Sequence, residues 1–278
     1  VSGLFSAQSD LCGHDEHAPL RCPQSACQSP EIRFAGVGTE RVEETLVKLY
    51  PRATLRRMDS DTLKKKEDYK RILTEFRQGK VDILIGTQMI AKGLHFPNVT
   101  LVGIIYADLS LHIPDFRSGE RTFQLITQVA GRAGRGEVEG DVYVQSLTPF
   151  HPAIQYARRH DYIGFYEQEW EFRQQTDYPP SRRLALVTLR GLHEEKIRLS
   201  ANHMRQALEQ ATTDLSGVSF SGPAPAPLER VENHYRFQIL VRAHRMQRLS
   251  VCMAEVLQSL RLPEGVKVSV DIDPVNLC

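Results

Sequence analysis

The apolar positions between residues 36 and 148 follow two periods that alternate along the chain. Apolar residues three and four positions apart, which indicate one face of a helix, recur within residues 40–50, 69–76 and 118–130. Short apolar runs, which are typical of buried strands, lie at residues 53–58, 81–85, 99–106 and 140–145. This alternation predicts a parallel sheet that is covered by helices on both faces.

The pattern changes after Pro149, where a long amphipathic helix is predicted over residues 153–173. The elements predicted after it are strand 184–189, helix 194–211, strand 218–222, the proline-rich connection 223–227, strand 235–242, helix 245–260 and strand 266–271. This β-α-β-β-α-β order predicts a small ferredoxin-like split unit. Helical spacing predicts that core residues include Phe123, Ile126, Val251 and Leu257.

The first 35 residues are rich in turn-forming residues and carry three of the five cysteines, so a small loop-like unit is expected there. The expected fold class is therefore α/β, in three parts. These are residues 1–35, a lobe with a parallel sheet over residues 36–148, and a smaller α+β domain over residues 149–278.

Composition narrows the class of protein. The 278 residues include 35 basic and 34 acidic side chains, for a formal charge of +1, so contact with nucleic acid must be local rather than through a basic tail. No apolar run reaches the roughly 18 residues of a membrane span, and no signal peptide precedes the first elements. The scattered cysteines favour a reducing cytoplasm over a disulfide framework. Because the chain starts at Val1, we expect it to be part of a longer protein.

Two segments carry residues suited to phosphate chemistry. Gln128, Arg132 and Arg135 share one face of a helix, while Gly131 lies on another. A guanidinium contacts two phosphate oxygens at once, and glycine allows close approach; the alternative is a surface arginine pair. The strand at 83–85 runs into a second segment with small, hydroxyl and amide residues, at the edge where α/β sheets bind ligands: Gly86, Thr87, Gln88 and, further on, Gly93. The alternative there is a simple turn.

These segments resemble motifs V and VI of superfamily-two helicases. More closely, residues 36–135 resemble the second motor lobe of the PriA family of primosomal replication-restart helicases, through residues 38–41, 83–93, 115–121 and 128–135. The tail resembles the C-terminal domain of that family through residues 179–180, 222–227, 236–238 and 270–274. The resemblance covers nearly the whole chain, and it implies a RecA-like lobe followed by the smaller domain.

The resemblance implies roles for the phosphate-binding candidates. In the family, ATP and Mg²⁺ lie between two RecA-like lobes, and the second lobe supplies arginines to the transferring phosphoryl group. By resemblance, Arg132 and Arg135 are the arginine-finger positions and Gln128 senses nucleotide. The resemblance also implies that the nucleotide cleft is coupled to DNA by Gly86, Thr87, Gln88 and Gly93, and that Gly131 is a further cofactor-binding position. The chain has no Gly-x-x-x-x-Gly-Lys-Ser/Thr loop, so the first lobe is expected to be missing.

Residues for DNA or partner contact also follow from the resemblance. They are Arg117 and Arg121 in the first part, and Arg236 and Gln238, which share one face of a strand. The alternatives are a solvated, salt-bridged turn over residues 115–121 and a strand face that meets only solvent. The partners implied are single-stranded and forked DNA, the single-stranded-DNA-binding protein and other primosome proteins, with no membrane partner.

Cys12, Cys22 and Cys27 resemble the end of the family's zinc-binding insertion, with Ser9 where a paired cysteine is expected. Three cysteines leave one ligand of a tetrahedral zinc site to be found, and His14 or His17 would have to supply it. The alternative is a cysteine-rich remnant without metal.

Together these features predict the C-terminal part of an ATP-dependent 3′-to-5′ DNA helicase that restarts stalled replication forks, inactive as this chain alone. Two alternatives stay open: a DNA- or protein-binding module without enzymatic activity, and another superfamily-two translocase.

Overall fold

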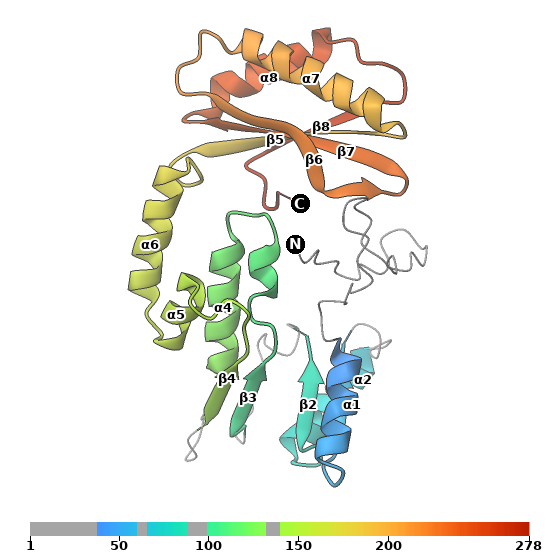
Figure 1. Cartoon of the computed structure of the whole chain (residues 1–278), viewed down its shortest axis with the longest axis vertical. Coiled ribbons are helices and arrows are strands. Elements are labelled where there is room, and N and C mark those ends of the chain that lie inside the picture. The colour runs from blue at the N-terminus through green and yellow to red at the C-terminus, as the bar shows by residue number, and fades with distance from the viewer. Residues whose placement is uncertain (1–37, 60–65, 88–98, 132–139, 278) are drawn as a thin grey trace, which may run out of the picture. The chain divides into compact units, whose positions relative to one another are not determined.

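The computed structural model describes residues 38–59, 66–87, 99–131 and 140–277 (Figure 1). The chain forms two compact units. Within the described residues, unit 1 extends to His112 and resumes over residues 119–162, whereas unit 2 comprises residues 113–118 and 163–277.

Unit 1 contains short parallel strands that pair two by two. β1 (Leu55–Met58) pairs with β2 (Ile83–Gly86), and β3 (Leu101–Ile104) pairs with β4 (Asp141–Val144). The predicted strands and their parallel pairing are confirmed, although the described residues form two two-stranded sheets and not the single sheet predicted. Each strand starts one or two residues later than predicted; β3 and β4 also end one or two residues earlier, and β2 ends one residue later.

Among the described residues, one helix precedes β1, one connects β1 to β2, and one connects β3 to β4 after the 3₁₀ turn η1 (Leu109–His112). The helices are α1 (Thr39–Leu49), α2 (Lys66–Arg77) and α4 (Ser118–Ala130). One core cluster joins Met58 of β1 to Ile72 and Leu73 of α2. In α4, Phe123 and Ile126 are buried as predicted, on the same face as Thr122.

The prediction of one long helix over residues 153–173 is wrong. The structure has α5 (Pro152–Arg158) and then α6 (Tyr162–Gln175). Between them His160 has φ 53°, a left-handed conformation that an α-helix does not propagate. The N–H of His160 donates to the carbonyl of Ala157, which closes α5.

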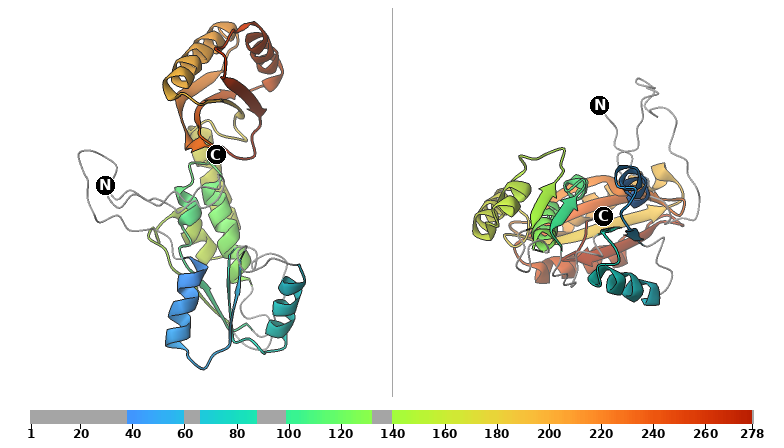
Figure 2. Two further views of the ribbon diagram at one scale, coloured as in Figure 1. Left: turned by 90° about the vertical axis from the view of Figure 1, so that its right-hand side faces the viewer. Right: turned by 90° about the horizontal axis from the view of Figure 1, so that it is seen from below.

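Unit 2 is built on a four-stranded antiparallel sheet in the order β6-β7-β5-β8. The strands are β5 (Arg183–Gly191), β6 (Ser219–Val231), β7 (His234–Ala243) and β8 (Lys267–Ile272). Helices α7 (Glu194–Ala211) and α8 (Met246–Ser259) lie on one side of this sheet (Figure 2). The main core forms between helices and sheet, and includes Leu189, Met204, Ile239 and Leu249.

The prediction that Val251 and Leu257 are core residues is wrong, because they are 57% and 40% exposed. The buried stripe of α8 is Met246, Leu249, Met253 and Val256, so the helix is rotated relative to the predicted face.

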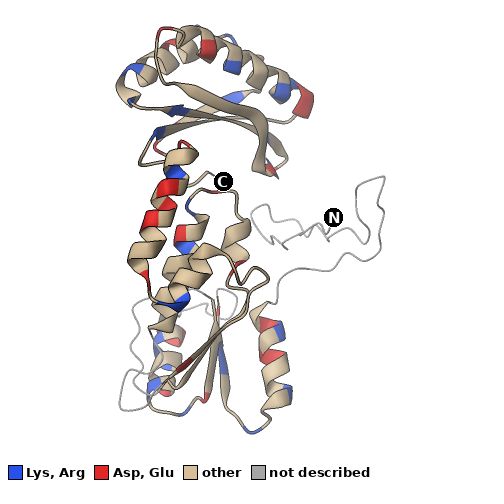
Figure 3. Ribbon diagram, turned by 60° about the vertical axis from the view of Figure 1, so that its left-hand side comes forward, with Lys and Arg blue, Asp and Glu red and all other residues tan. Residues whose placement is uncertain are grey.

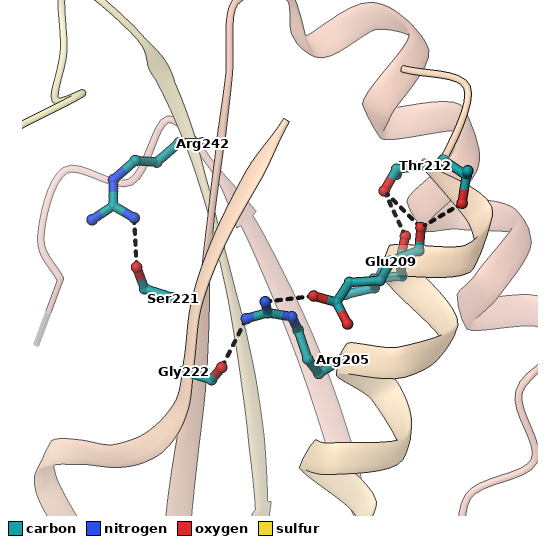
Figure 4. Close-up of polar contacts among 8 residues, drawn as sticks. Arg205, Glu209, Thr212, Ser221, Gly222 and Arg242 are labelled. Carbon is teal, nitrogen blue, oxygen red and sulfur yellow. Dashed lines mark hydrogen bonds and ion pairs between the residues drawn. The ribbon is translucent and has the colours of Figure 1, made fainter. Parts of the chain in front are cut away.

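The predicted proline-rich connection after residue 222 is also wrong, because β6 continues through it to Val231. β6 lies at the edge of the sheet, where proline is tolerated because one side of the strand needs no N–H donor. Arg205 of α7 fixes the bend at Gly222: its guanidinium donates to the Gly222 carbonyl at 2.8 Å and to Glu209 at 2.5 Å (Figure 4). Arg242 donates to Ser221 Oγ at 2.7 Å on the neighbouring strand.

None of the helices in the described ranges combines the length and the apolar character needed to cross a bilayer.

Candidate functional site

The first candidate site lies at the carboxyl ends of β1 and β2, where Met58 pairs with Gly86. Asp59, the next residue after β1, is 4% exposed. Its carboxylate accepts a hydrogen bond from Thr39 Oγ1 at 2.6 Å and lies 3.3 Å from Arg57 Nε. These contacts hold the first turn of α1 at the strand edge that bears Gly86 and Thr87, both of which are exposed. Asp59 was missed by the sequence analysis, although its position directly after a strand is a usable signal.

The motif at the end of α4 is described only in part. Gln128 is exposed in the last turn of α4, and the N–H of Gly131 continues the helical pattern by donating to the Thr127 carbonyl at 3.1 Å. Other residues predicted for this site lie outside the described residues: Gln88, Gly93, Arg132 and Arg135. Among the described residues, no hydrogen bond joins Gln128 to Gly86 or Thr87, so their common cleft stays a prediction.

A buried carboxylate links the segments that follow β3 and β4. Asp108 is 1% exposed, and its Oδ2 accepts hydrogen bonds from the N–H groups of Leu147 and Thr148 at 2.8 and 3.0 Å and from Thr148 Oγ1 at 3.1 Å. Burial alone would raise the pKa of Asp108, but these hydrogen bonds and one from its own backbone outweigh burial and lower it.

His151, three residues after Thr148, caps α5: its Nδ1 accepts the N–H of Ala153 at 3.2 Å. Burial lowers the pKa of His151, and the charge of Asp108 opposes that shift only in part. This shift favours the neutral imidazole, the form whose Nδ1 can accept a hydrogen bond.

The segment between η1 and α4 packs within unit 2. Phe116 is 8% exposed and packs with Leu184, Leu186 and Leu277, and its ring lies parallel to that of Tyr178, with centroids 5.0 Å apart. We call this pocket the Phe116 seat, formed by Tyr178, Leu184, Leu186, Leu240 and Leu277. A solvated turn, the alternative for this segment, does not describe Asp115 and Phe116, because both are buried.

Arg117, predicted to contact DNA or a partner, lies beside this seat. Its guanidinium carbon is 4.1 Å from the centroid of the Phe116 ring, and its Nη1 donates to the carbonyls of Pro274 and Val275, each at 3.1 Å. Arg121 is half-buried in the first turns of α4.

Arg236 and Gln238 lie on the face of the sheet that is opposite α7 and α8, because their neighbours Phe237 and Ile239 are in the main core. We call this the opposite face. The register places Arg236 beside Arg190 of β5, and Arg190 beside Lys267 of β8. We call these three residues the cation row. The row next to it consists of Gln238, Thr188 and Ser269.

The cation row is electrostatically unfavourable by itself, because like charges directly opposite on neighbouring strands repel. Within the described residues, none of the three side chains forms an ion pair, whereas Arg183 at the other end of β5 pairs with Asp273. Figure 3 shows blue bands on the strands of this sheet and bands of both signs on the helices. Gln238 Nε2, in the adjacent row, is buried and has no acceptor among the described residues. A bound polyanion would relieve this repulsion.

Comparison with known proteins matches both units to families. Residues 36–137 match the helicase conserved C-terminal domain, and residues 174–275 match the primosomal protein N C-terminal domain. Replication restart protein PriA of Bacillus subtilis is 44% identical over 266 residues, which are 95% of this chain and 32% of that protein. The chain belongs to the PriA family.

Further PriA relatives agree. PriA of Treponema pallidum is 41% identical over a region that covers 97% of this chain and 40% of that protein. PriA of Synechocystis is 38% identical over a region that covers 96% of this chain and 31% of that protein. The chain thus spans about a third of the length of the PriA proteins that it matches. The predicted resemblance is confirmed, and the α/β class with parallel strands is confirmed with it. The individual site residues stay predictions.

Proposed function

We propose that this chain is the C-terminal part of an ATP-dependent 3′-to-5′ DNA helicase that restarts stalled replication forks. The observation that carries the proposal is the 44% identity to a replication restart protein over 95% of the chain. The order of chain elements in unit 2 supports its assignment to the split β-α-β class. The cysteines Cys12, Cys22 and Cys27 lie outside the described residues, and we assign them to the remainder of a degenerate zinc site.

The nucleotide would bind at the strand edge that bears Gly86 and Thr87. The fit is favourable, because both residues are exposed at the carboxyl end of a parallel strand and Gly86 leaves its backbone accessible. ATP bound with Mg²⁺ supplies the free energy for movement along DNA. This chain would contribute Gln128, Gly131 and the following arginines, Arg132 and Arg135, which stabilise negative charge on the phosphoryl group. The phosphate-binding lysine would come from the lobe that this chain lacks.

The experiment that tests this division of roles uses the intact protein. Arg132→Ala or Arg135→Ala should lower ATP turnover by about 10³-fold while DNA affinity stays nearly constant, because the arginines act on the transition state. The present chain alone should show no DNA-stimulated ATPase activity. Loss of DNA binding with an altered salt dependence would contradict the assignment, and so would turnover by this chain alone that Arg135→Ala abolishes.

DNA contact would be made in part by the cation row. Three cations at one register of neighbouring strands can each neutralise a phosphate of single-stranded or forked DNA. Gln238, in the adjacent row, is the further contact that we propose, and it requires the buried Nε2 to become exposed. The single-stranded-DNA-binding protein and other primosome proteins are the protein partners that we propose.

A binding module without enzymatic activity is the second candidate, favoured by the absence of a phosphate-binding loop in this sequence. DNA-stimulated ATPase activity of the intact protein would exclude it.

A further inference from the structure

The sheet of unit 2 ends at β8, because β8 pairs with β5 and with no other strand among the described residues. The two strands pair antiparallel along the whole of β8, from Lys267 opposite Arg190 to Ile272 opposite Ala185, without a shift of register. β8 contains neither proline nor glycine, so each of its residues carries an N–H group and a side chain. β8 is therefore a regular edge strand.

The register identifies the backbone groups of β8 that point away from β5. The N–H of Asp273 donates to the carbonyl of Leu184 at 2.8 Å, and these two residues are opposite partners when the register is continued by one residue. Hydrogen-bonded and non-hydrogen-bonded pairs alternate along antiparallel strands, so every second residue counted back from Asp273 bonds to β5. The residues between them direct their N–H and C=O groups outward. These are Val268, Val270 and Ile272.

Both ends of β8 are anchored within unit 2. Before the strand, the N–H of Val266 donates to the Pro263 carbonyl at 3.2 Å. After it, Arg183 Nε donates to Asp273 Oδ1 at 3.1 Å. Apart from the pairing with β5, no backbone hydrogen bond of β8 is found in the described part of the chain. The outward donors and acceptors are therefore already arranged as a strand, and a second strand could bind them without ordering them first.

The side chains of β8 are of two kinds. Val268 and Val270 lie on the side of α7 and α8, where they pack against the main core. Lys267, Ser269 and Asp271 are exposed on the opposite face. Directly opposed residues of neighbouring strands share a face of the sheet. An added strand that fits β8 therefore has apolar residues opposite the two valines and polar residues between them.

Two charges on the opposite face make this fit selective. Lys267 lies at the end of the cation row, beside Arg190, and Asp271 is four residues further along the same face of β8. An acidic residue opposite Lys267 would meet two neighbouring cations, and a basic residue opposite Asp271 would form a cross-strand ion pair. The whole sheet is antiparallel. A strand that continues it in this way has its basic residue four positions before its acidic residue.

We propose that β8 is a docking edge for an extended segment of a partner protein, which extends the four-stranded sheet by one antiparallel strand. Backbone hydrogen bonds to Val268, Val270 and Ile272 hold the segment, and the two charges set its register. The segment is apolar at every second position, and a basic residue precedes an acidic residue by four positions on its other side. This inference goes beyond the proposed function and does not rest on it, because no step of it involves ATP or DNA.

A second copy of this chain is the alternative occupant, since β8 itself has Lys267 four residues before Asp271. Two copies paired in this way would be joined only along one short strand each. Such a contact is smaller than the roughly 1,000 Å² that a stable interface between folded proteins buries. A short segment needs only the edge itself, because backbone hydrogen bonds provide much of the affinity when a peptide adds a strand. The edge therefore fits a segment better than a second copy.

The test measures binding of two fluorescein-labelled peptides to this chain by fluorescence anisotropy. The matched peptide, Val-Lys-Val-Thr-Val-Glu, places its lysine opposite Asp271 and its glutamate opposite Lys267. The exchanged peptide, Val-Glu-Val-Thr-Val-Lys, differs only in the positions of the two charges. We expect the matched peptide to bind about 5-fold more tightly, and the double variant Lys267→Glu, Asp271→Lys should reverse this preference.

A backbone variant tests the edge itself. Ile272→Pro removes an outward N–H, whereas the N–H groups that bond to β5 remain. Ile272 is 42% exposed, so little packing is lost. The affinity for the matched peptide should fall by about 10-fold relative to the control Ile272→Ala, which loses most of the same side chain but keeps the N–H. If Ile272→Pro does not fold, the charge exchange decides the question alone.

Residue-resolved amide exchange by NMR gives a third measurement. In the free chain, the N–H groups of Val268 and Val270 should exchange faster than those of Ser269 and Asp271, and saturating matched peptide should slow them by about 10-fold or more. Slow exchange of the two valines in the free chain would show that the edge is already paired, and a dependence on protein concentration would assign it to a second copy. Either result overturns the inference.

Three binding results also overturn it: no binding of the matched peptide, equal affinity of the two peptides, or equal affinity of Ile272→Pro and Ile272→Ala. Failure of the proposed function is a separate result, because it would appear in the ATPase activity of the intact protein and would leave these peptide measurements unchanged.

Discussion

The cation row gives a prediction that can be tested with this chain itself. The perturbation replaces Arg190, Arg236 and Lys267 by glutamine in one variant. These side chains come from three neighbouring strands at one register, and Arg190 and Lys267 are exposed. Glutamine keeps an unbranched, polar side chain without the charge, so the sheet should fold as before, and relief of like-charge repulsion should leave it slightly more stable.

The magnitude follows from counterion release. Each cation that neutralises a phosphate of single-stranded DNA contributes about 0.7 to the slope of log K against log salt concentration. Loss of three such contacts should therefore reduce the slope by about 2, and most of the lost affinity should appear at the lowest salt concentration.

The assay is fluorescence anisotropy of a labelled single strand, titrated with protein from about 50 to about 200 mM salt. A control variant with Lys196→Gln, Arg248→Gln and Arg261→Gln loses the same charge from other parts of unit 2, and it should keep the original slope. Equal slopes in all three proteins would refute the reasoning. Equal reductions in both variants would show that only net charge matters, and that the row is no binding site.

Two further predictions concern stability. Because burial lowers the pKa of His151 below its ordinary value of 6.5, protonation favours the unfolded chain. The free energy of unfolding should therefore fall as pH drops below about 6.5. His151→Asn, which keeps a helix cap, should flatten this pH dependence in urea titrations above pH ~5, where Asp108 stays ionised. An unchanged slope of unfolding free energy against pH would contradict the role of His151. Gly222→Ala should destabilise by about 3 kcal/mol or more, because φ is +89° and a Cβ would lie 2.6 Å from the Gln238 carbonyl oxygen. In the control Gly265→Ala, φ is +84° but no atom lies within 4 Å of the added Cβ. This variant should lose only about 1–2 kcal/mol of stability in thermal unfolding. An equal loss of stability in both variants would rule out the clash at Gly222.

Local patterns predicted most elements, and tertiary context accounts for the errors. Helix 194–211 was predicted with its observed bounds, because its apolar stripe and the acidic residues of its first turn agree. The extent of β6 was not predictable, because proline in a strand is acceptable only at an edge, and the strand order decides which strand is the edge.

The candidate sites show the same difference between residues that a local pattern predicts and residues that depend on tertiary contacts. Gly86 and Thr87 could be placed from the strand that precedes them. Asp108 was missed because its partners are 39 and 40 residues away, and no short-range pattern marks such a carboxylate. The seat of Phe116 was missed for the same reason, since the hydrogen bonds of the adjacent Arg117 span more than 150 positions of sequence.

The prolines of β6 have a consequence for self-association. Pro223, Pro225 and Pro227 lie in an edge strand and carry no N–H group. The register of β6 with β7 also shifts between Ser221 and Ala224 and between Pro225 and Arg230, so the strand is irregular on both sides of Pro225. Missing donors and irregular pairing both keep an edge strand from serving as a template for another strand. This part of β6 is therefore protected against extension of the sheet by a second copy or by an unfolded chain.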